Sequence, residues 1–155
     1  MLRNIISLLA GIIGGIVALI IAVLLEVLLG TLYKPLPLAG NQIFLIFLAV
    51  PALIEEITKV TVAKRIFIQR NNFWAIVGTG LGFGLAEAYS IQNQSALGTS
   101  LVFLPLVHFI FLTTGFLIAK RLTKDSKYLY LEWLIASTLL HWGYNFAQAA
   151  FLLKP

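Results

Sequence analysis

Long apolar segments dominate the chain and constrain its fold more than any other feature. Hydrophobic residues make up 60% of the 155 positions and charged residues only 11%. An α-helix needs about 20 apolar residues to cross the roughly 30 Å of hydrocarbon in a bilayer. Five segments come near this length, at residues 5–29, 42–63, 73–92, 99–119 and 129–153. We therefore predict an all-α fold in which residues 1–155 form one transmembrane domain, a polytopic bundle of about five spans.

The basic residues are distributed unequally between the two sides of such a bundle. With the N-terminus inside, Lys34 and Lys154 lie on the outer side, and eight others lie on the inner side, namely Arg3, Lys64, Arg65, Arg70, Lys120, Arg121, Lys124 and Lys127. The positive-inside rule then predicts an N-in, C-out orientation. We attribute the net charge of +5 to contacts with anionic membrane lipids and not to nucleic acid. The expected location is the cytoplasmic membrane of a prokaryote, as an integral membrane protein.

Several ionisable side chains interrupt the apolar segments. Each charge at the centre of a bilayer costs about 2.5–3.5 kcal/mol, so such residues are rare unless they face a bundle interior and serve a function. Depth can be counted from the predicted inner boundaries at about 1.5 Å per residue, which gives about 13 Å for Glu55, about 16 Å for His108, about 18 Å for His141 and about 21 Å for Glu87. These residues come from four different segments, and their similar depth predicts one shared polar site.

Helical spacing places further polar groups beside these residues. Lys59 follows Glu55 by four positions and Glu56 by three, so it can pair with either carboxylate. His141 and Asn145 are four positions apart in the sequence HWGYN and lie on one helix face. We therefore expect the second segment to offer a carboxylate with a cationic partner, and the fifth to offer two hydrogen-bond donors.

Glycines give two segments small-residue faces. Gly11, Gly14 and Gly15 lie in the first segment, and the sequence GTGLGFG at residues 78–84 lies in the third. Helices with small residues at i, i+4 spacing can approach closely, so we predict a thin, close-packed third helix that brings Glu87 near the neighbouring spans. The glycine run does not match GxGxxG, and we do not expect it to bind a nucleotide.

Four short motifs occur in order, each on its own predicted span: EExxK at Glu55–Lys59, FxxxE at Phe83–Glu87, an isolated histidine at His108, and HxxxN at His141–Asn145. This order resembles that of the PrsW-type intramembrane proteases, in the superfamily that also contains the CAAX prenyl endopeptidases and the bacteriocin-processing membrane proteases. Lys59 stands where the CAAX pattern has a more distant arginine, and Glu87 where it has histidine, so the resemblance favours the PrsW side. It covers residues 51–145, within a motif-bearing core of about 42–153. The resemblance implies a hydrolase, an intramembrane endopeptidase that cleaves a membrane-embedded or lipid-anchored peptide substrate.

The reaction implied is hydrolysis by an activated water. We assign Glu55 as the general base, with Glu56 beside it adjusting its basicity, although the sequence leaves open which of the two is the base. His141 and Asn145 would donate hydrogen bonds to the oxyanion that forms at the scissile carbonyl. Supporting roles fall to Lys59 and Phe83.

The residues also permit a form of this site that contains a metal ion. Glu87, His108 and His141 supply one carboxylate and two imidazoles, the ligand types of a hydrolytic Zn²⁺ site with one position open for water. Glu55 would then act on the metal-bound water. A metal-free mechanism, in which Glu55 and a histidine activate the water, is equally compatible with the sequence.

Two other functions are compatible with the same residues. A proton-linked transporter would use Glu55, Glu87, His108 and His141 as a relay, and with five spans it would need to form an oligomer. A non-catalytic scaffold of the same superfamily is the third interpretation, although the presence of both glutamates, both histidines and Asn145 argues against it. The chain has no HExxH motif, no cysteine and a single aspartate in the basic inner loop, Asp125. These absences exclude a zincin motif, a thiol nucleophile and an intramembrane aspartyl dyad.

Overall fold

The chain folds into α-helices only, over the residues that the computed structural model describes: 1–32, 40–70, 72–90, 94–123 and 128–152. The helices are α1 (Leu2–Leu32), α2 (Gly40–Arg70), α3 (Trp74–Ser90), α4 (Gln94–Leu122) and α5 (Leu129–Leu152). The prediction of an all-α fold is confirmed for this part of the chain. Three helices are longer than the apolar segments that predicted them, because polar residues beyond an apolar stretch continue the helix. In α2, for example, the helix runs past position 63 through Lys64 and Arg65 to Arg70.

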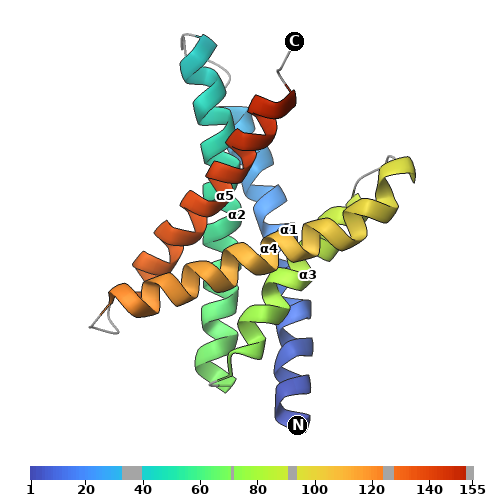
Figure 1. The fold of residues 1–155 in the computed structure, drawn as a ribbon, viewed down its shortest axis with the longest axis vertical. Helices are drawn as coiled ribbons and strands as arrows, with labels where there is room; N and C mark the ends of the chain where they lie inside the picture. Colours follow the sequence, from blue (N-terminus) through green and yellow to red (C-terminus); the bar gives the residue numbers. More distant parts are fainter. Residues whose placement is uncertain (33–39, 71, 91–93, 124–127, 153–155) are drawn as a thin grey trace.

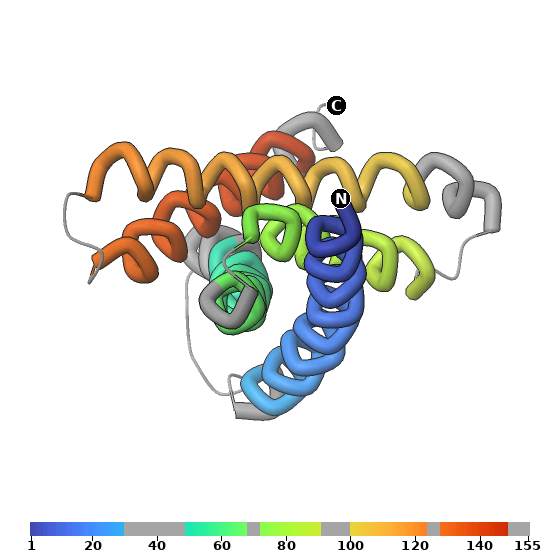
Figure 2. The backbone as a smooth tube through the Cα atoms, turned by 90° about the horizontal axis from the view of Figure 1, so that it is seen from below, coloured from blue at the N-terminus to red at the C-terminus, as the bar shows by residue number. Residues whose placement is uncertain are grey.

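The five helices run alternately up and down the molecule. In Figure 1, α1 starts at one end, α2 returns to it, α3 leaves it again, and α4 comes back obliquely before α5 ends at the opposite end. Contacts between helices form a ring in the order α1, α3, α4, α5, α2 and back to α1, and α2 also contacts α3 across the ring. The end-on view shows α3 between α1 and α4 (Figure 2). Every helix therefore has at least two neighbours, and α2 contacts each of the other four helices.

Two of the helices have the length and composition to cross a membrane. They are α1 over Leu2–Leu29 and α4 over Ser100–Leu122, with 28 and 23 residues respectively. α3 has 17 residues, about 26 Å at 1.5 Å per residue, which is shorter than a typical bilayer core. The described part of α2 carries the charges of Glu55, Glu56 and Lys59, followed by those near its C-terminal end. By length and hydropathy alone, the described residues thus contain two candidate membrane spans, and the predicted five spans are not confirmed.

Glycines hold α3 close to its neighbours on two opposite faces. Residues two positions apart on an α-helix point about 200° apart, so alternate glycines of GTGLGFG face opposite ways. Gly82 faces α1, where a Cβ would strike the backbone of Ile12. Gly80 faces α4, where a Cβ would lie 2.7 Å from the Cα of Phe109. Neither position has room for a larger side chain, and α1, α3 and α4 form one closely packed unit, as the glycine pattern predicted for the third helix.

Two apolar clusters fill the interior. The larger one joins α2, α3, α4 and α5 and consists of Val60, Ala63, Ile76, Leu112, Phe116, Ala119 and Trp133. The smaller one joins α1, α2 and α3 and consists of Ala18, Ala22, Ile54 and Phe83. α2 contributes Ile54 to one cluster and Val60 to the other, so the turn of α2 that carries its adjacent glutamates lies between the two.

Candidate active site

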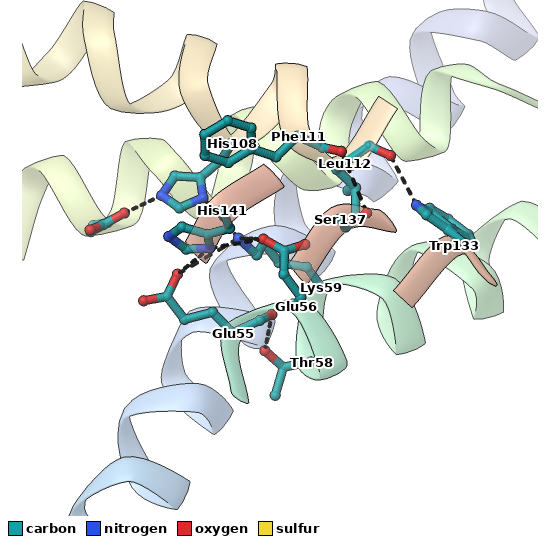
Figure 3. A network of polar contacts seen from close by, with 11 residues as sticks. Glu55, Glu56, Thr58, Lys59, His108, Phe111, Leu112, Trp133, Ser137 and His141 are labelled. Atoms are coloured by element: carbon teal, nitrogen blue, oxygen red, sulfur yellow. Dashed lines mark hydrogen bonds and ion pairs between the residues drawn. The ribbon is translucent and has the colours of Figure 1, made fainter. Parts of the chain in front are cut away.

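Side chains from α2, α3, α4 and α5 meet in one group with a buried centre, called here the polar cluster (Figure 3). Its members are Glu55, Glu56 and Lys59 from α2, Glu87 from α3, His108 from α4 and His141 from α5. Glu56 and Lys59 have no exposed surface, and both histidines are nearly as well buried. The structure therefore brings together the ionisable residues for which the sequence predicted a shared site.

Lys59 lies at the centre of the polar cluster. Its ammonium is 2.5 Å from Oε1 of Glu56 and 3.7 Å from Oε2 of Glu55. It also donates a hydrogen bond of 2.8 Å to Nδ1 of His108, and the Phe83 ring covers it at 4.5 Å from the ring centroid. A buried ammonium requires such partners, and the face of an aromatic ring adds further stabilisation. Lys59 thus ties α2 to α4, a contact that spacing along α2 did not predict.

The two adjacent glutamates have different surroundings. Glu56 is fully buried, and its Oε1 contacts both Lys59 and His141. Its Oε2 has no hydrogen-bond partner among the described residues, but none of the side chain reaches the surface. The side chain of Glu55 keeps 17% of its surface exposed, and its Oε2 likewise has no hydrogen-bond partner in the described part of the chain. Glu56 therefore holds its neighbours in place, and Glu55 is the carboxylate that water or a ligand can reach.

The hydrogen bonds of His108 define its tautomer. Its Nδ1 accepts from the ammonium of Lys59, which has donors only. The proton of the neutral imidazole then sits on Nε2, which donates to Oε2 of Glu87. Phe83 packs against the same ring with its centroid at 4.9 Å. Both nitrogens of His108 are therefore occupied, and this one ring connects α3 and α4 to Lys59.

His141 is held in the opposite tautomer. Its Nδ1 donates to Oε1 of Glu56 over 3.0 Å, because an ionised carboxylate can only accept. In the neutral imidazole, Nε2 then carries a lone pair and no proton. This orientation bears on the predicted role of His141 as an oxyanion donor, since Nε2 can donate only after it has taken up a proton.

Asn145 lies one helical turn beyond His141 on α5 and is half-buried. Among the described residues, the hydrogen bonds of the polar cluster include His141 and not Asn145. Its side-chain amide is therefore available to a ligand placed beside the cluster. Its assignment as an oxyanion donor stays a prediction.

Three ligand atoms, one each from Glu55, His108 and His141, lie within 4.8 Å of one another, so this group could hold a metal ion. The set contains Glu55 in place of Glu87, the carboxylate that the sequence assigned to the metal. Glu87 instead accepts a hydrogen bond from Nε2 of His108. A neutral imidazole has a single lone pair, and that of His108 is used by Lys59. Coordination by His108 therefore requires that Lys59 release it.

Phe111 was not among the predicted site residues, although it borders the polar cluster. Its ring lies 5.4 Å from that of His141 and 5.5 Å from that of Tyr144, measured between centroids. Tyr144 in turn packs against Phe103 at 6.2 Å. The sequence contained the necessary signal, because Phe111 follows His108 by three positions and so lies on the same face of α4.

Comparison with protein-family models, with curated proteins and with solved structures gives no match to this chain. The resemblance to the PrsW-type proteases therefore depends on the four sequence motifs, and membership of that family is a proposal. The chemistry of the site has to be inferred from its own geometry.

Proposed function

We propose that the protein is an integral membrane endopeptidase of the PrsW type, in which Glu55 activates the water that hydrolyses a peptide bond of a membrane-embedded or lipid-anchored substrate. The observation that carries this proposal is the unequal use of the two adjacent glutamates. Glu56 is fully buried and contacts Lys59 at 2.5 Å and His141 at 3.0 Å, whereas Glu55 lies 3.7 Å from each of them and keeps 17% of its side chain exposed. A carboxylate that is open to water beside fixed histidines is the arrangement that general-base hydrolysis requires.

The surface of the helices supports a location within lipid. Large apolar side chains are exposed along most of α1, and Ile13 and Leu24 each have 64% of their surface exposed. An exposed apolar surface of this extent is typical of an interface with a membrane or a partner protein. Arg3 at the start of α1, Lys64 near the end of α2 and Lys120 near the end of α4 belong to helix ends in the same half of the molecule (Figure 1). We therefore include the five-span, N-in, C-out topology in the proposal.

The proposed reaction has two steps. A water beside Glu55 gives a proton to the carboxylate as its oxygen attacks the scissile carbonyl, which becomes a tetrahedral oxyanion. The amide of Asn145 donates a hydrogen bond to that oxyanion, a contribution of about 3 kcal/mol per donor in comparable sites. The C–N bond then breaks, and the proton passes from Glu55 to the leaving amine. His141 Nδ1, whose proton is donated to Glu56, lies 3.7 Å from Oε2 of Glu55, so this imidazole faces the base with its N–H.

The proposal is tested by cleavage of a panel of transmembrane and lipid-anchored peptides with purified protein in lipid vesicles. Wild-type protein is expected to release products, and Glu55→Gln to release none. Glu132→Gln is the matched control, because Glu132 lies in the first turn of α5, contacts Thr123 and is not part of the polar cluster. Equal cleavage by wild type and Glu55→Gln would refute the assigned base, and no cleavage of any peptide by wild type would count against a peptidase.

A proton relay is the second function that a specific observation favours. Close polar contacts run from Glu87 through His108, Lys59 and Glu56 to His141. A relay requires each member to accept a proton on one side and donate it on the other. The ammonium of Lys59 faces both of its neighbours as a donor and has no lone pair with which to accept, so it interrupts the path. We therefore place hydrolysis ahead of transport.

Proton flux into vesicles that contain a pH-sensitive dye distinguishes the two functions. The peptidase proposal predicts no flux above that of empty vesicles. Flux that is abolished by His108→Gln and kept by Asn145→Ala would instead support a relay, because only His108 lies within the chain of polar contacts.

A further inference from the structure

We infer that the ammonium of Lys59 occupies the position in which the polar cluster would otherwise bind a divalent metal ion, so that the native site is closed to metal and a Lys59→Met substitution opens it. This exclusion of metal by Lys59 is a property of the polar cluster itself and does not require the proposed peptidase activity.

The first support is the set of donors around Lys59. Glu55, His108 and His141 offer ligand atoms within 4.8 Å of one another, and Nζ of Lys59 lies within 3.7 Å of Glu55 and of His108. One carboxylate and two imidazoles are ligands that Zn²⁺ and Co²⁺ accept. The donor set for a metal is therefore assembled around a residue that is itself a cation.

The second support is the position of the ammonium relative to these donors. Nζ of Lys59 lies 2.5 Å from Glu56 and 2.8 Å from Nδ1 of His108, and 3.7 Å from Glu55. A zinc ion at about 2.1 Å from Nδ1 would use the same lone pair and overlap Nζ. The other nitrogen of His108 carries the proton that is donated to Glu87. Lys59 and a metal coordinated by His108 therefore exclude each other.

The third support is the charge of the cluster. Removal of the ammonium leaves Glu55 and Glu56 without their cation, and an uncompensated buried charge is strongly destabilising. A divalent ion restores positive charge at the same place. An ion that binds only the folded state stabilises it. Addition of a divalent metal should therefore raise the thermal midpoint of Lys59→Met and leave that of the wild type unchanged.

Cobalt(II) is the probe for the test, because its absorption spectrum reports coordination by the same nitrogen and oxygen ligands that zinc uses. Purified wild type, Lys59→Met and Lys59→Arg are titrated with Co²⁺, dialysed and analysed for bound metal, and their thermal midpoints are measured with and without the ion. Lys59→Met is expected to retain stoichiometric Co²⁺ and to show a higher midpoint in its presence. Wild type and Lys59→Arg are expected to retain no stoichiometric metal and to show no shift.

Two controls locate the ion. Lys64→Met removes a lysine from the same helix that lies over the Tyr130 ring at 4.2 Å, outside the polar cluster, and should not create metal binding. The double variant Lys59→Met/His141→Ala should lose the Co²⁺ that Lys59→Met retains. Metal that survives this second substitution would lie elsewhere and would contradict the inference.

Stoichiometric Co²⁺ in the wild type that is lost in His141→Ala would overturn the inference, because the site would then accept a metal beside Lys59. Folded Lys59→Met that binds no Co²⁺ would overturn it as well. Lys59→Met is produced with and without Co²⁺ in the medium, and failure to fold under both conditions would also contradict the inference, since the metal is expected to replace the missing charge. None of these measurements uses a substrate, so failure of the peptidase proposal would leave their outcome unchanged.

Discussion

Glu56 and His141, 85 residues apart in the sequence, are joined by a hydrogen bond of 3.0 Å between Oε1 and Nδ1. Both side chains are buried, and the bond fixes α5 to α2 at the polar cluster. Glu56 could act on a water through Oε1 only if it released His141. The neighbouring Glu55 carries no such bond. The two adjacent glutamates therefore have separate tasks, and their substitutions should have separate effects.

Glu55→Gln is expected to lower turnover by at least about 100-fold, the lower end of what a general base contributes, and to leave the thermal midpoint near that of wild type. Glu56→Gln is expected to lower the midpoint, because it removes the charge that pairs with buried Lys59 at 2.5 Å. Cleavage assays in vesicles and thermal unfolding in detergent separate the two effects. A stable Glu56→Gln protein alongside an unfolded Glu55→Gln protein would reverse our assignment of the two residues.

Lys59→Ala in metal-free buffer is expected to cost about 3–5 kcal/mol of folding stability, the usual effect of breaking a buried ion pair by removing one partner. The double variant Lys59→Ala/Glu56→Gln should recover part of this loss, because the second substitution removes the carboxylate left unpaired. Thermal midpoints of the two single variants and the double variant form a mutant cycle that measures the coupling. Additive losses in that cycle would show that the pair contributes nothing of its own.

Gly80→Ala is expected to destabilise the protein by about 1–3 kcal/mol, the typical cost of overpacking, because the new Cβ would lie 2.7 Å from the Cα of Phe109. The displacement of α4 should also separate His108 from Glu87 and lower activity. Gly143→Ala is the matched control, since a Cβ there meets no atom within 4 Å, and alanine improves helix propensity by about 1 kcal/mol. Comparable thermal midpoints for the two variants would show that α3 and α4 can move apart without loss.

The five-span topology predicts the accessibility of single cysteines, which can be placed uniquely because the chain has none of its own. Cysteines substituted for Ser95 and Lys154 should react with an impermeant reagent from outside intact cells. Cysteines substituted for Arg70 and Lys124 should react only after the membrane is opened. Labelling of position 124 from outside would exclude the proposed five-span, N-in arrangement.

The sequence predicted the all-α fold and the residues of the polar cluster because both can be recognised from the order of residues along the chain. Apolar runs of about 20 residues mark helices, and Glu55 or His108 within such a run marks a buried polar site. The helix ends were less accurate, since Lys64 and Arg65 continue α2 beyond the apolar stretch that hydropathy detects.

The partners within the polar cluster could not be predicted in the same way. Spacing shows which residues share a helix face, but it does not give the rotation of one helix against another. The hydrogen bond between Lys59 and His108 depends on that rotation. The rotation also decides which carboxylate joins the two histidines in the group that could hold a metal, and this carboxylate is Glu55, where the sequence had suggested Glu87. For the same reason, spacing could not show which of the two adjacent glutamates accepts the hydrogen bond from His141; in the structure it is Glu56.

The close backbone contacts made by Gly80 and Gly82 have a mechanical consequence. They leave α1, α3 and α4 little freedom to move against one another, and Gly115 packs α4 closely on the backbone of Ser137 in α5. The helix best able to move against the rest is therefore α2, which Gly14 of α1 meets only through the side chains of Val62 and Ile66. Such a movement would carry Glu55 away from both histidines, and the hydrogen bond from Lys59 to His108 would have to break. In the proposed peptidase, a peptide would enter between α2 and the other helices and lie between Glu55 and the two imidazoles.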